Sequence, residues 1–320
     1  MPVAGFRLPK TGFWTLETGH WTLYTGHRIM IPKETLQQIR RIQITTSRMV
    51  TDVFAGHYHS VFKGKGMDFD EVREYQPGDD IRSIDWNVTA RTGHPFIKKF
   101  TEERELTIMI LLDISGSSYF GTVNKLKSRL AAEICSVLAL SAVKNNDKVG
   151  LIAFTDRIEK FVPPRKGLRH VLRIIREALY YEPEGKGTDI PGSLEHLNRV
   201  INRRAVTFVI SDFYAEDFKK SLSIANKRHD IVALSITDPR ELDLPDIGII
   251  NLEDAETGKA FLVDTSSSTV RKDYSINSKR IFDERQRLLR SINVDHIDVR
   301  TDMPYAHALY KFFRMRERRI

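Results

Sequence analysis

The chain has 320 residues, of which 41% are hydrophobic, so it can bury a large core and is not disordered throughout. Its formal charge is +8, but basic and acidic residues are mixed along most of the chain, which disfavours a nucleic-acid-binding protein. The single cysteine, Cys135, excludes an intramolecular disulfide, and its apolar surroundings predict a core thiol in a reducing compartment.

Residues 1–29 contain the repeat TGFWTLETGHWTLYTGH, whose period of about seven residues fits neither a helix nor a strand. We therefore expect these residues to form a disordered extension. They lack the continuous apolar run and small-residue cleavage site of a signal peptide. No stretch of the sequence reaches the roughly 18 apolar residues of a membrane span. We expect a cytoplasmic protein.

Residues 30–104 are predicted to form a helix followed by a small subdomain. The spacing of Ile39 and Ile42 is typical of a helix. Within 60–100, the turn signal QPGDD lies between short runs that favour β-structure. We expect Trp86 to anchor this β-containing subdomain.

The segment FDEVREYQPGDDIRSIDW in this subdomain allows two interpretations. Its charged residues could present a surface to a partner protein, or they could pair with one another and fix the subdomain. We favour internal pairing, because a loop-rich element with mixed charges needs such contacts. The candidate partner-binding residues are Asp79, Asp80, Arg82 and Asp85.

From residue 105 to residue 320 the sequence alternates between strands and helices. The strands are nearly continuous apolar runs, which is typical of a parallel sheet buried on both faces. We therefore predict an α/β domain with an open, doubly wound, mostly parallel sheet. Strands are expected at 106–113, 147–156, 157–164 (an edge strand), 205–213, 230–238 and 294–301, and a hairpin at 248–264.

Oxygen-bearing side chains follow two of these strands and precede one helix. Asp113, Ser115 and Ser117 come at the end of the first strand, Asp212 ends a later strand, and Thr188 lies in the loop EGKGTDIPGS. Since the carboxyl ends of parallel strands meet at one edge of the sheet, we expect these side chains to converge. Hard oxygens of this kind suit Mg²⁺, with Mn²⁺ or Ca²⁺ as alternatives, and leave a coordination position for a partner's carboxylate.

Each residue also has a simpler explanation. Ser117 or Ser118 could cap the following helix while Asp113 accepts backbone hydrogen bonds. Thr188 could cap the helix that follows it, and Asp212 could merely end a strand. The occurrence of all three groups at one predicted edge favours the metal site.

Enzymatic alternatives are weaker. A haloacid-dehalogenase-type phosphatase needs a second carboxylate two residues after the first, where this chain has Ser115. Neither serine lies in the G-x-S-x-G motif of a serine hydrolase, and no Walker-type phosphate loop is present in the sequence.

The pattern Asp-x-Ser-x-Ser, then Thr, then Asp resembles the metal-ion-dependent adhesion site of von Willebrand factor type A domains. The matching residues are Asp113, Ser115, Ser117, Thr188 and Asp212. The resemblance implies that Ser115, Ser117 and Thr188 bind the metal directly, while Asp113 and Asp212 act largely through water.

A second resemblance covers most of the chain from Met30 onward. The segments FDEVREYQPGDDIRSIDWNVTAR, PFIKKFTEERELT and LLDISGS resemble the bacterial domain of unknown function 58 family, whose members are often encoded beside MoxR-type AAA+ ATPases. This resemblance implies a type A-like domain preceded by a small subdomain, with a role in MoxR-linked assembly or maturation of a client protein.

These observations together predict a non-enzymatic, Mg²⁺-dependent protein-interaction module. Its expected partner is a MoxR-type AAA+ ATPase, or the client of that ATPase, bound through an acidic residue. The alternative from another class is a structural scaffold whose metal site is vestigial.

Overall fold

The computed structural model describes residues 13–17, 20–24, 68–101, 105–122, 125–215, 217–256 and 258–319. The chain divides into two compact units, residues 1–38 and residues 39–320. The helix predicted around Ile39 and Ile42 lies outside the described residues.

The first unit contains an antiparallel pair of strands, β1 (Phe13–Glu17) and β2 (His20–Tyr24). The sequence repeat was not expected to form strands. Threonine, tryptophan and leucine dominate both segments, and the first two favour extended backbone. The rest of the predicted extension lies outside the described residues.

A small subdomain begins the described part of the second unit. The predicted β-structure beside QPGDD is present: strand β3 (Asp68–Glu74) pairs antiparallel with β4 (Phe96–Thr101). Between them lie a 3-10 turn, η2 (Ile81–Ser83), and a short helix, α3 (Trp86–Thr92), both begun by an aspartate cap. Trp86 is 66% exposed, so its expected role as an anchor is wrong.

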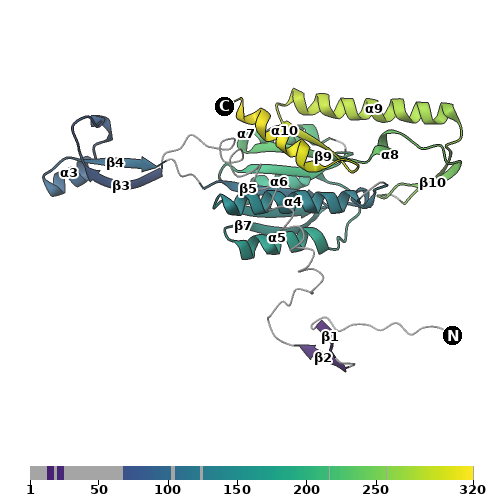
Figure 1. Cartoon of the computed structure of the whole chain (residues 1–320), viewed down its shortest axis with the longest axis horizontal. Coiled ribbons are helices and arrows are strands. Elements are labelled where there is room, and N and C mark those ends of the chain that lie inside the picture. The colour runs from purple at the N-terminus through teal and green to yellow at the C-terminus, as the bar shows by residue number, and fades with distance from the viewer. Residues whose placement is uncertain are drawn as a thin grey trace. The chain divides into compact units, whose positions relative to one another are not determined.

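The main domain is built on a six-stranded sheet (Figure 1). Its spatial order is β12-β9-β8-β5-β6-β7, which in chain order of the strands reads 6-5-4-1-2-3. Every neighbouring pair is parallel except β6–β7. The predicted edge strand, β7, is thus confirmed at the edge, and it is antiparallel to β6. The strands are β5 (Thr107–Asp113), β6 (Lys148–Phe154), β7 (Ile158–Arg165), β8 (Val206–Ser211), β9 (Asp230–Thr237) and β12 (Asp295–Arg300).

This strand order places a topological switch between β5 and β8. From β5 the chain first builds outward to β7, then returns to the other side of β5 and builds outward to β12. The loops after β5 and β8 therefore diverge to opposite faces of the sheet at its carboxyl edge, and ligands bind at such a point in doubly wound folds. The α/β doubly wound architecture predicted from the sequence is confirmed.

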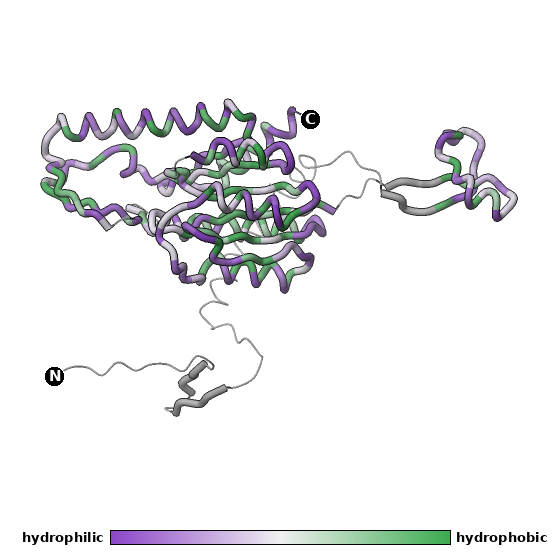
Figure 2. The backbone as a smooth tube through the Cα atoms, turned by 180° about the vertical axis from the view of Figure 1, so that it is seen from behind, coloured by the Kyte–Doolittle hydropathy of each residue, from purple (hydrophilic) through white to green (hydrophobic). Residues whose placement is uncertain are grey.

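Helices cover both faces of the sheet. Figure 2 shows the strands of the sheet as hydrophobic stretches and the longest helix, α9, as alternating hydrophilic and hydrophobic turns. In the described ranges, no helix combines the length and apolar character needed to cross a membrane. The helices are α4 (Lys127–Lys144), α5 (Leu168–Tyr180), α6 (Ile190–Val200), α7 (Phe218–Arg228), α8 (Pro239–Leu242), α9 (Ser268–Ser291) and α10 (Tyr305–Glu317).

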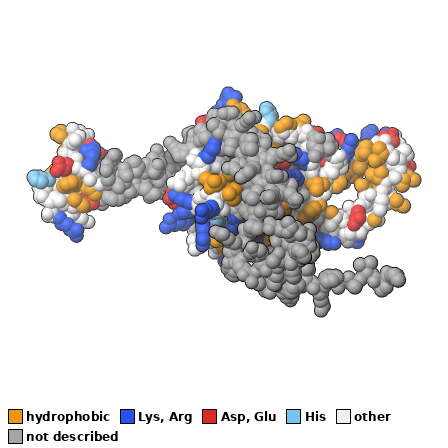
Figure 3. Space-filling view, turned by 60° about the horizontal axis from the view of Figure 1, so that its bottom comes forward, with side chains coloured by type: hydrophobic (Ala, Val, Ile, Leu, Met, Phe, Trp, Pro, Cys, Tyr) orange, Lys and Arg blue, Asp and Glu red, His pale blue; other side chains and the backbone are white. Residues whose placement is uncertain are grey.

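The predicted hairpin is formed by β10 (Ile249–Glu253) and β11 (Ala260–Asp264), which pair with each other and with no strand of the large sheet. Several apolar side chains here are exposed, among them Ile249 at 72% and Leu262 at 79%. Figure 3 shows hydrophobic side chains gathered at this end of the domain. The hairpin is thus only lightly packed.

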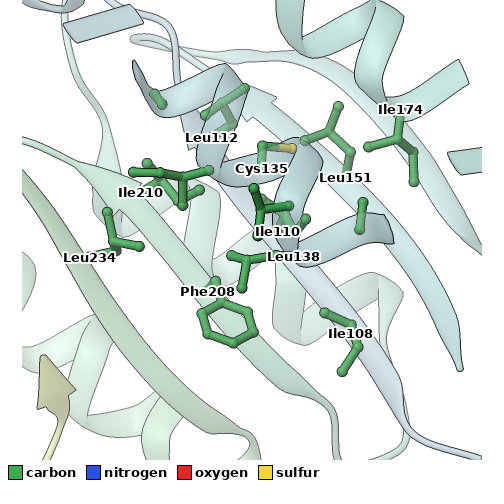
Figure 4. Packing of buried hydrophobic residues seen from close by; sticks show 14 of the residues in the cluster. Ile108, Ile110, Leu112, Cys135, Leu138, Leu151, Ile174, Phe208, Ile210 and Leu234 are labelled. Atoms are coloured by element: carbon green, nitrogen blue, oxygen red, sulfur yellow. The ribbon is translucent and has the colours of Figure 1, made fainter. Parts of the chain in front are cut away.

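The core of the main domain lies on both sides of β5. Alternate residues of this strand enter two separate apolar clusters. Ile108, Ile110 and Leu112 pack beneath α4 and α5 (Figure 4), whereas Met109 and Leu111 pack on the opposite face. All five are at most 1% exposed. This burial on both faces holds β5 rigidly, so the residues at its end are presented from a fixed position.

Candidate ligand site at the carboxyl edge of the sheet

Asp113, the last residue of β5, is the centre of the site. Its side chain is buried, and Oδ1 accepts a hydrogen bond of 3.0 Å from the backbone N–H of Ser115. Its Oδ2 accepts a hydrogen bond of 2.6 Å from the Ser211 hydroxyl on β8. The carboxylate therefore shapes the turn after β5 and also ties β5 to β8 across the switch point.

The two serines of the motif converge as the sequence predicts. The Oγ atoms of Ser115 and Ser117 are 3.2 Å apart, with Ser115 fully buried and Ser117 half-buried. They lie at the start of the 3-10 turn η3 (Gly116–Tyr119). Helix α4 begins only at Lys127, after Leu126, so the alternative that Ser117 or Ser118 caps it is wrong.

Asp212 follows β8 and is also buried. Its Oδ2 lies 2.7 Å from the ammonium of Lys127, which also lies 2.5 Å from Glu241 Oε1. Lys127 is only 2% exposed. The sequence therefore places Asp212 correctly at the edge, but the structure shows that it has an internal cation as its partner.

Sequence reasoning missed Lys127 and Glu241, although a signal for Lys127 was present. Lys127 precedes the buried Leu130 and Ile134 by three and seven residues, a spacing that places all three on the same face of α4. A lysine on the buried face of a helix needs an acidic partner. Such acids, Asp113 and Asp212, were already predicted at the ends of two strands.

Arg285 is a second buried cation near Asp212. It lies on α9 and donates through one terminal nitrogen to the main-chain carbonyl of Asp212, and through the other to the Thr237 hydroxyl at 3.3 Å. Its guanidinium also lies 5.7 Å from the centre of the Tyr214 ring. These contacts fix the loop after β8 against α9.

Thr188 lies in the loop before α6, and this loop contacts the turn after β5. Its loop is joined to the motif because the backbone N–H of Gly116 donates to the carbonyl of Lys186 at 2.8 Å. The Thr188 hydroxyl donates to Glu256 Oε1 at 2.7 Å, in an exposed contact. Thr188 does not cap α6, because Asp189 is the residue that caps it.

The two buried acids of the site differ in their charged neighbours: Asp212 pairs with Lys127, whereas Asp113 lies next to another acid, Asp212. Burial, and next the charge of Asp212, raise the pKa of Asp113 to about 6. Burial alone would lower the pKa of Lys127, but the attraction of Asp212 and Glu241 outweighs it and raises that pKa. No lysine or arginine in the described part of the chain forms an ion pair with Asp113.

These features fit a hard divalent cation. Within the described ranges, no group of three His, Cys, Asp or Glu side chains is arranged to bind a metal, so a cation at this edge would need hydroxyl ligands. Two converging hydroxyls form such a donor set beside Asp113, a buried carboxylate that has no cationic partner among the described residues. A cavity of about 10 Å³, roughly the space of one water, adjoins Asp113, Ser117, Lys127 and Asp212, and is lined as well by the apolar Ala131, Ile210 and Ile236.

The candidate partner-binding residues of the small subdomain make local contacts. Asp79 accepts two hydrogen bonds from Arg73, at 2.9 and 2.7 Å. Asp80 accepts from the backbone N–H of Arg82, and Asp85 accepts from the backbone of the first turn of α3. These contacts account for the three acids through local pairing and capping; their role toward a partner stays a prediction.

Comparisons with known proteins identify a family and uncharacterized relatives. The family model described as "Protein of unknown function DUF58" matches residues 71–283. The uncharacterized protein Rv1480 of Mycobacterium tuberculosis is 29% identical over 285 residues, which cover 88% of this chain and 89% of the relative. The uncharacterized protein YeaD of Bacillus subtilis is 24% identical over 161 residues, covering 50% of this chain and 38% of the relative.

Solved structures with some likeness include the conserved hypothetical protein BatB from Bacteroides thetaiotaomicron. Its TM-score is 0.41 at 18% identity, covering 67% of this chain and 99% of that protein. The SpRpn10 VWA domain has a TM-score of 0.34 at 11% identity, covering 42% of this chain and 76% of that domain. The family expected from the sequence is confirmed by the family match: this chain belongs to the DUF58 family of proteins of unknown function.

Proposed function

We propose that this chain is a non-enzymatic protein-interaction module whose binding site is the carboxyl edge of the sheet. A divalent cation, Mg²⁺ in the first instance, would capture a carboxylate of a partner protein there. The partner would be a MoxR-type AAA+ ATPase or its client, as the family resemblance implies, in the cytoplasm. The observation that carries the proposal is the buried Asp113, which has no cationic partner in the described structure and lies beside two converging hydroxyls.

The residues have distinct parts in this proposal. Ser115, Ser117 and Thr188 would bind the cation through their hydroxyls, and Asp113 and Asp212 would act largely through water. When bound, the cation supplies an electrophilic coordination position that a carboxylate can complete. Asp113 fixes the turn through its bond to the Ser115 N–H, so the hydroxyls are positioned before any ligand arrives.

The hydrogen bonds of the site favour binding over catalysis. The hydroxyl of Ser115 contacts that of Ser117, and the hydroxyl of Ser118 donates to a backbone carbonyl. His170 bonds a backbone carbonyl of β6, and the pKa of the buried His229 is lowered by burial. A serine nucleophile is activated by an adjacent base, most often a histidine, and both of these histidines contact backbone groups elsewhere in the domain. The carboxylate beside the serines, Asp113, accepts from the Ser115 N–H and the Ser211 hydroxyl.

Calorimetric titration with MgCl₂ and with MnCl₂ tests the proposal. The wild type should bind one ion per chain, and Asp113→Asn should weaken this binding at least about tenfold. Asp147→Asn is a matched control, since Asp147 is a buried acid remote from the site whose pKa burial also raises to about 6. Its metal binding should equal that of the wild type.

Two results would count against the proposal. Absence of metal binding by the wild type, alone and with an added MoxR-type ATPase, would leave a scaffold with a vestigial site. Equal loss of binding in Asp113→Asn and Asp147→Asn would show that the effect is not specific to the site. A pull-down with the ATPase, with and without chelator, then tests the partner.

A further inference from the structure

The tip of the β10–β11 hairpin lies against the candidate site. The carbonyl oxygen of Ala255 is so close to Gly116 that a Cβ added there would lie only 2.5 Å from it. Real Cβ atoms do not approach backbone oxygens so closely, so only glycine permits this contact. Gly116, the fourth residue of the Asp113–Ser117 motif DISGS, is therefore in contact with a segment that is distant in sequence.

The tip also brings a carboxylate to the site. Glu256 Oε1 accepts the hydrogen bond of 2.7 Å from Thr188, one of the three hydroxyls expected to bind the metal. Asp254 shapes the turn that presents Glu256, since its side chain accepts from the Glu256 N–H at 3.0 Å and its carbonyl accepts from the Gly258 N–H at 2.7 Å. These contacts hold the acidic side chain of Glu256 next to the Thr188 hydroxyl.

The hairpin is anchored at its base and only lightly held along its strands. Thr265 is fully buried, and its hydroxyl donates to the Gly248 carbonyl at 2.6 Å and accepts from the Ile247 N–H at 3.1 Å. On the strands, by contrast, Phe261 is 57% exposed and Leu262 79% exposed. An isolated pair of strands with little apolar burial opens at low free-energy cost.

We propose that Glu256 is this chain's own ligand for the site. At rest, the hairpin tip occupies the site. Once the tip is displaced, a glutamate or aspartate on an exposed turn of another protein binds in its place. This inference rests on the proposed function. It adds that the site is occupied by Glu256 of the same chain at rest, and it specifies the kind of segment that the site recognises. The partner's segment is a turn that presents an acid next to small residues, because Gly116 accommodates a backbone at close range.

The arrangement predicts competition between the tip and the partner. When a binding-competent state is only partly populated, the apparent affinity falls by the populated fraction. Removing the Glu256 carboxylate should therefore strengthen binding of an acidic turn supplied from outside. It should also free the tip when no ligand or metal is present.

The first test uses hydrogen exchange measured by mass spectrometry on the full chain without metal. Glu256→Ala should speed exchange at least about threefold both in the hairpin and in the Ser115–Tyr119 turn. Glu253→Ala, which removes an exposed acid from the strand rather than the tip, should match the wild type. Exchange in Glu256→Ala that is the same as in the wild type would overturn the inference.

The second test supplies the tip from outside, as a labelled synthetic peptide with the sequence of residues 252–259, LEDAETGK. By fluorescence anisotropy it should bind Glu256→Ala at least about tenfold more tightly than wild type, and a peptide with glutamine at position 256 should bind neither.

Binding of the peptide to Glu256→Ala in Mg²⁺ but not in chelator supports the inference and the proposed function together. Binding in both conditions supports the inference and contradicts the metal dependence. Equal binding to Glu256→Ala and wild type, or binding to neither, overturns the inference, whereas the metal titration still decides the proposed function.

Discussion

The Lys127 ammonium lies 2.7 Å from the Asp212 carboxylate, and the two side chains are only 3% and 5% exposed. The ion pair joins the start of α4 to the end of β8 across the switch point of the sheet. A buried pair of this kind contributes little net free energy when intact but is costly to break on one side. Lys127 is therefore expected to be a structural support for the site.

Replacement of Lys127 tests this role. Lys127→Met should lower the free energy of unfolding by about 3 kcal/mol, because Asp212 and Glu241 would remain buried without a cation. Chemical denaturation measures the loss. Lys125→Met is the control, since Lys125 pairs with Glu133 on the surface and is 43% exposed; its effect should stay below about 1 kcal/mol. Equal effects of both variants would contradict the assigned role.

Asp113 is expected to contribute to binding rather than to stability. Its burial and the charge of Asp212 disfavour the ionised carboxylate, which raises its pKa to about 6. Asp113→Asn removes that charge and keeps an oxygen for the Ser115 N–H, so the free energy of unfolding should stay within about 1 kcal/mol of the wild type. Urea denaturation at neutral pH measures this. A loss above about 3 kcal/mol would mean that the carboxylate is mainly structural.

Gly116 should be required for the hairpin tip to reach the site. Gly116→Ala would place a Cβ 2.5 Å from the Ala255 carbonyl, so the tip must move and its hydrogen exchange should rise. Gly187→Ala is a matched control in the neighbouring loop, because its Cβ would meet only the Asp156 Cβ at an ordinary 3.5 Å. Protection of the tip that survives in Gly116→Ala would contradict the close contact.

His229 should make stability depend on pH. Burial, and next the charges of Arg228 and Arg204, lower the pKa of His229 to about 4, whereas an unfolded histidine titrates near 6.5. Because the folded pKa is the lower one, the stabilising contribution is complete above about pH 6.5 and is lost as pH falls through about 4.

His229→Gln should therefore reduce the loss of stability between about pH 7 and pH 4 by about 2 kcal/mol. Denaturation curves at several pH values measure this difference. The exposed His94 provides the control, and His94→Gln should leave the pH dependence of the wild type unchanged. A wild-type profile that His229→Gln does not alter would refute the assignment.

Cys135 is expected to be inert in the native protein. It is fully buried in α4, and burial raises its pKa to about 12. A thiol reagent should thus react only when the chain unfolds, at a rate that follows unfolding. Since the chain has one cysteine, the absorbance of the released chromophore reports on this residue alone. Rapid labelling under native conditions would contradict its place in the core.

The sequence predicted the sheet well because its signals are local. Apolar runs such as 106–113 are long enough to identify buried strands, and their alternation with helices implies parallel connections. The same logic located Asp113 and Asp212 at the ends of β5 and β8. The short strands β1 and β2 were missed, since five-residue segments carry too little periodicity.

By itself, the sequence thus determined the family, the doubly wound fold and the convergence of Asp113, Ser115 and Ser117 at one edge. Only the tertiary structure decided what surrounds them. The pairing of Lys127 with Asp212 spans 85 positions, and that of Thr188 with Glu256 spans 68. Such contacts depend on how helices and hairpins pack against the sheet. No local pattern encodes that packing, because it arises from the combined burial of many residues distant in sequence.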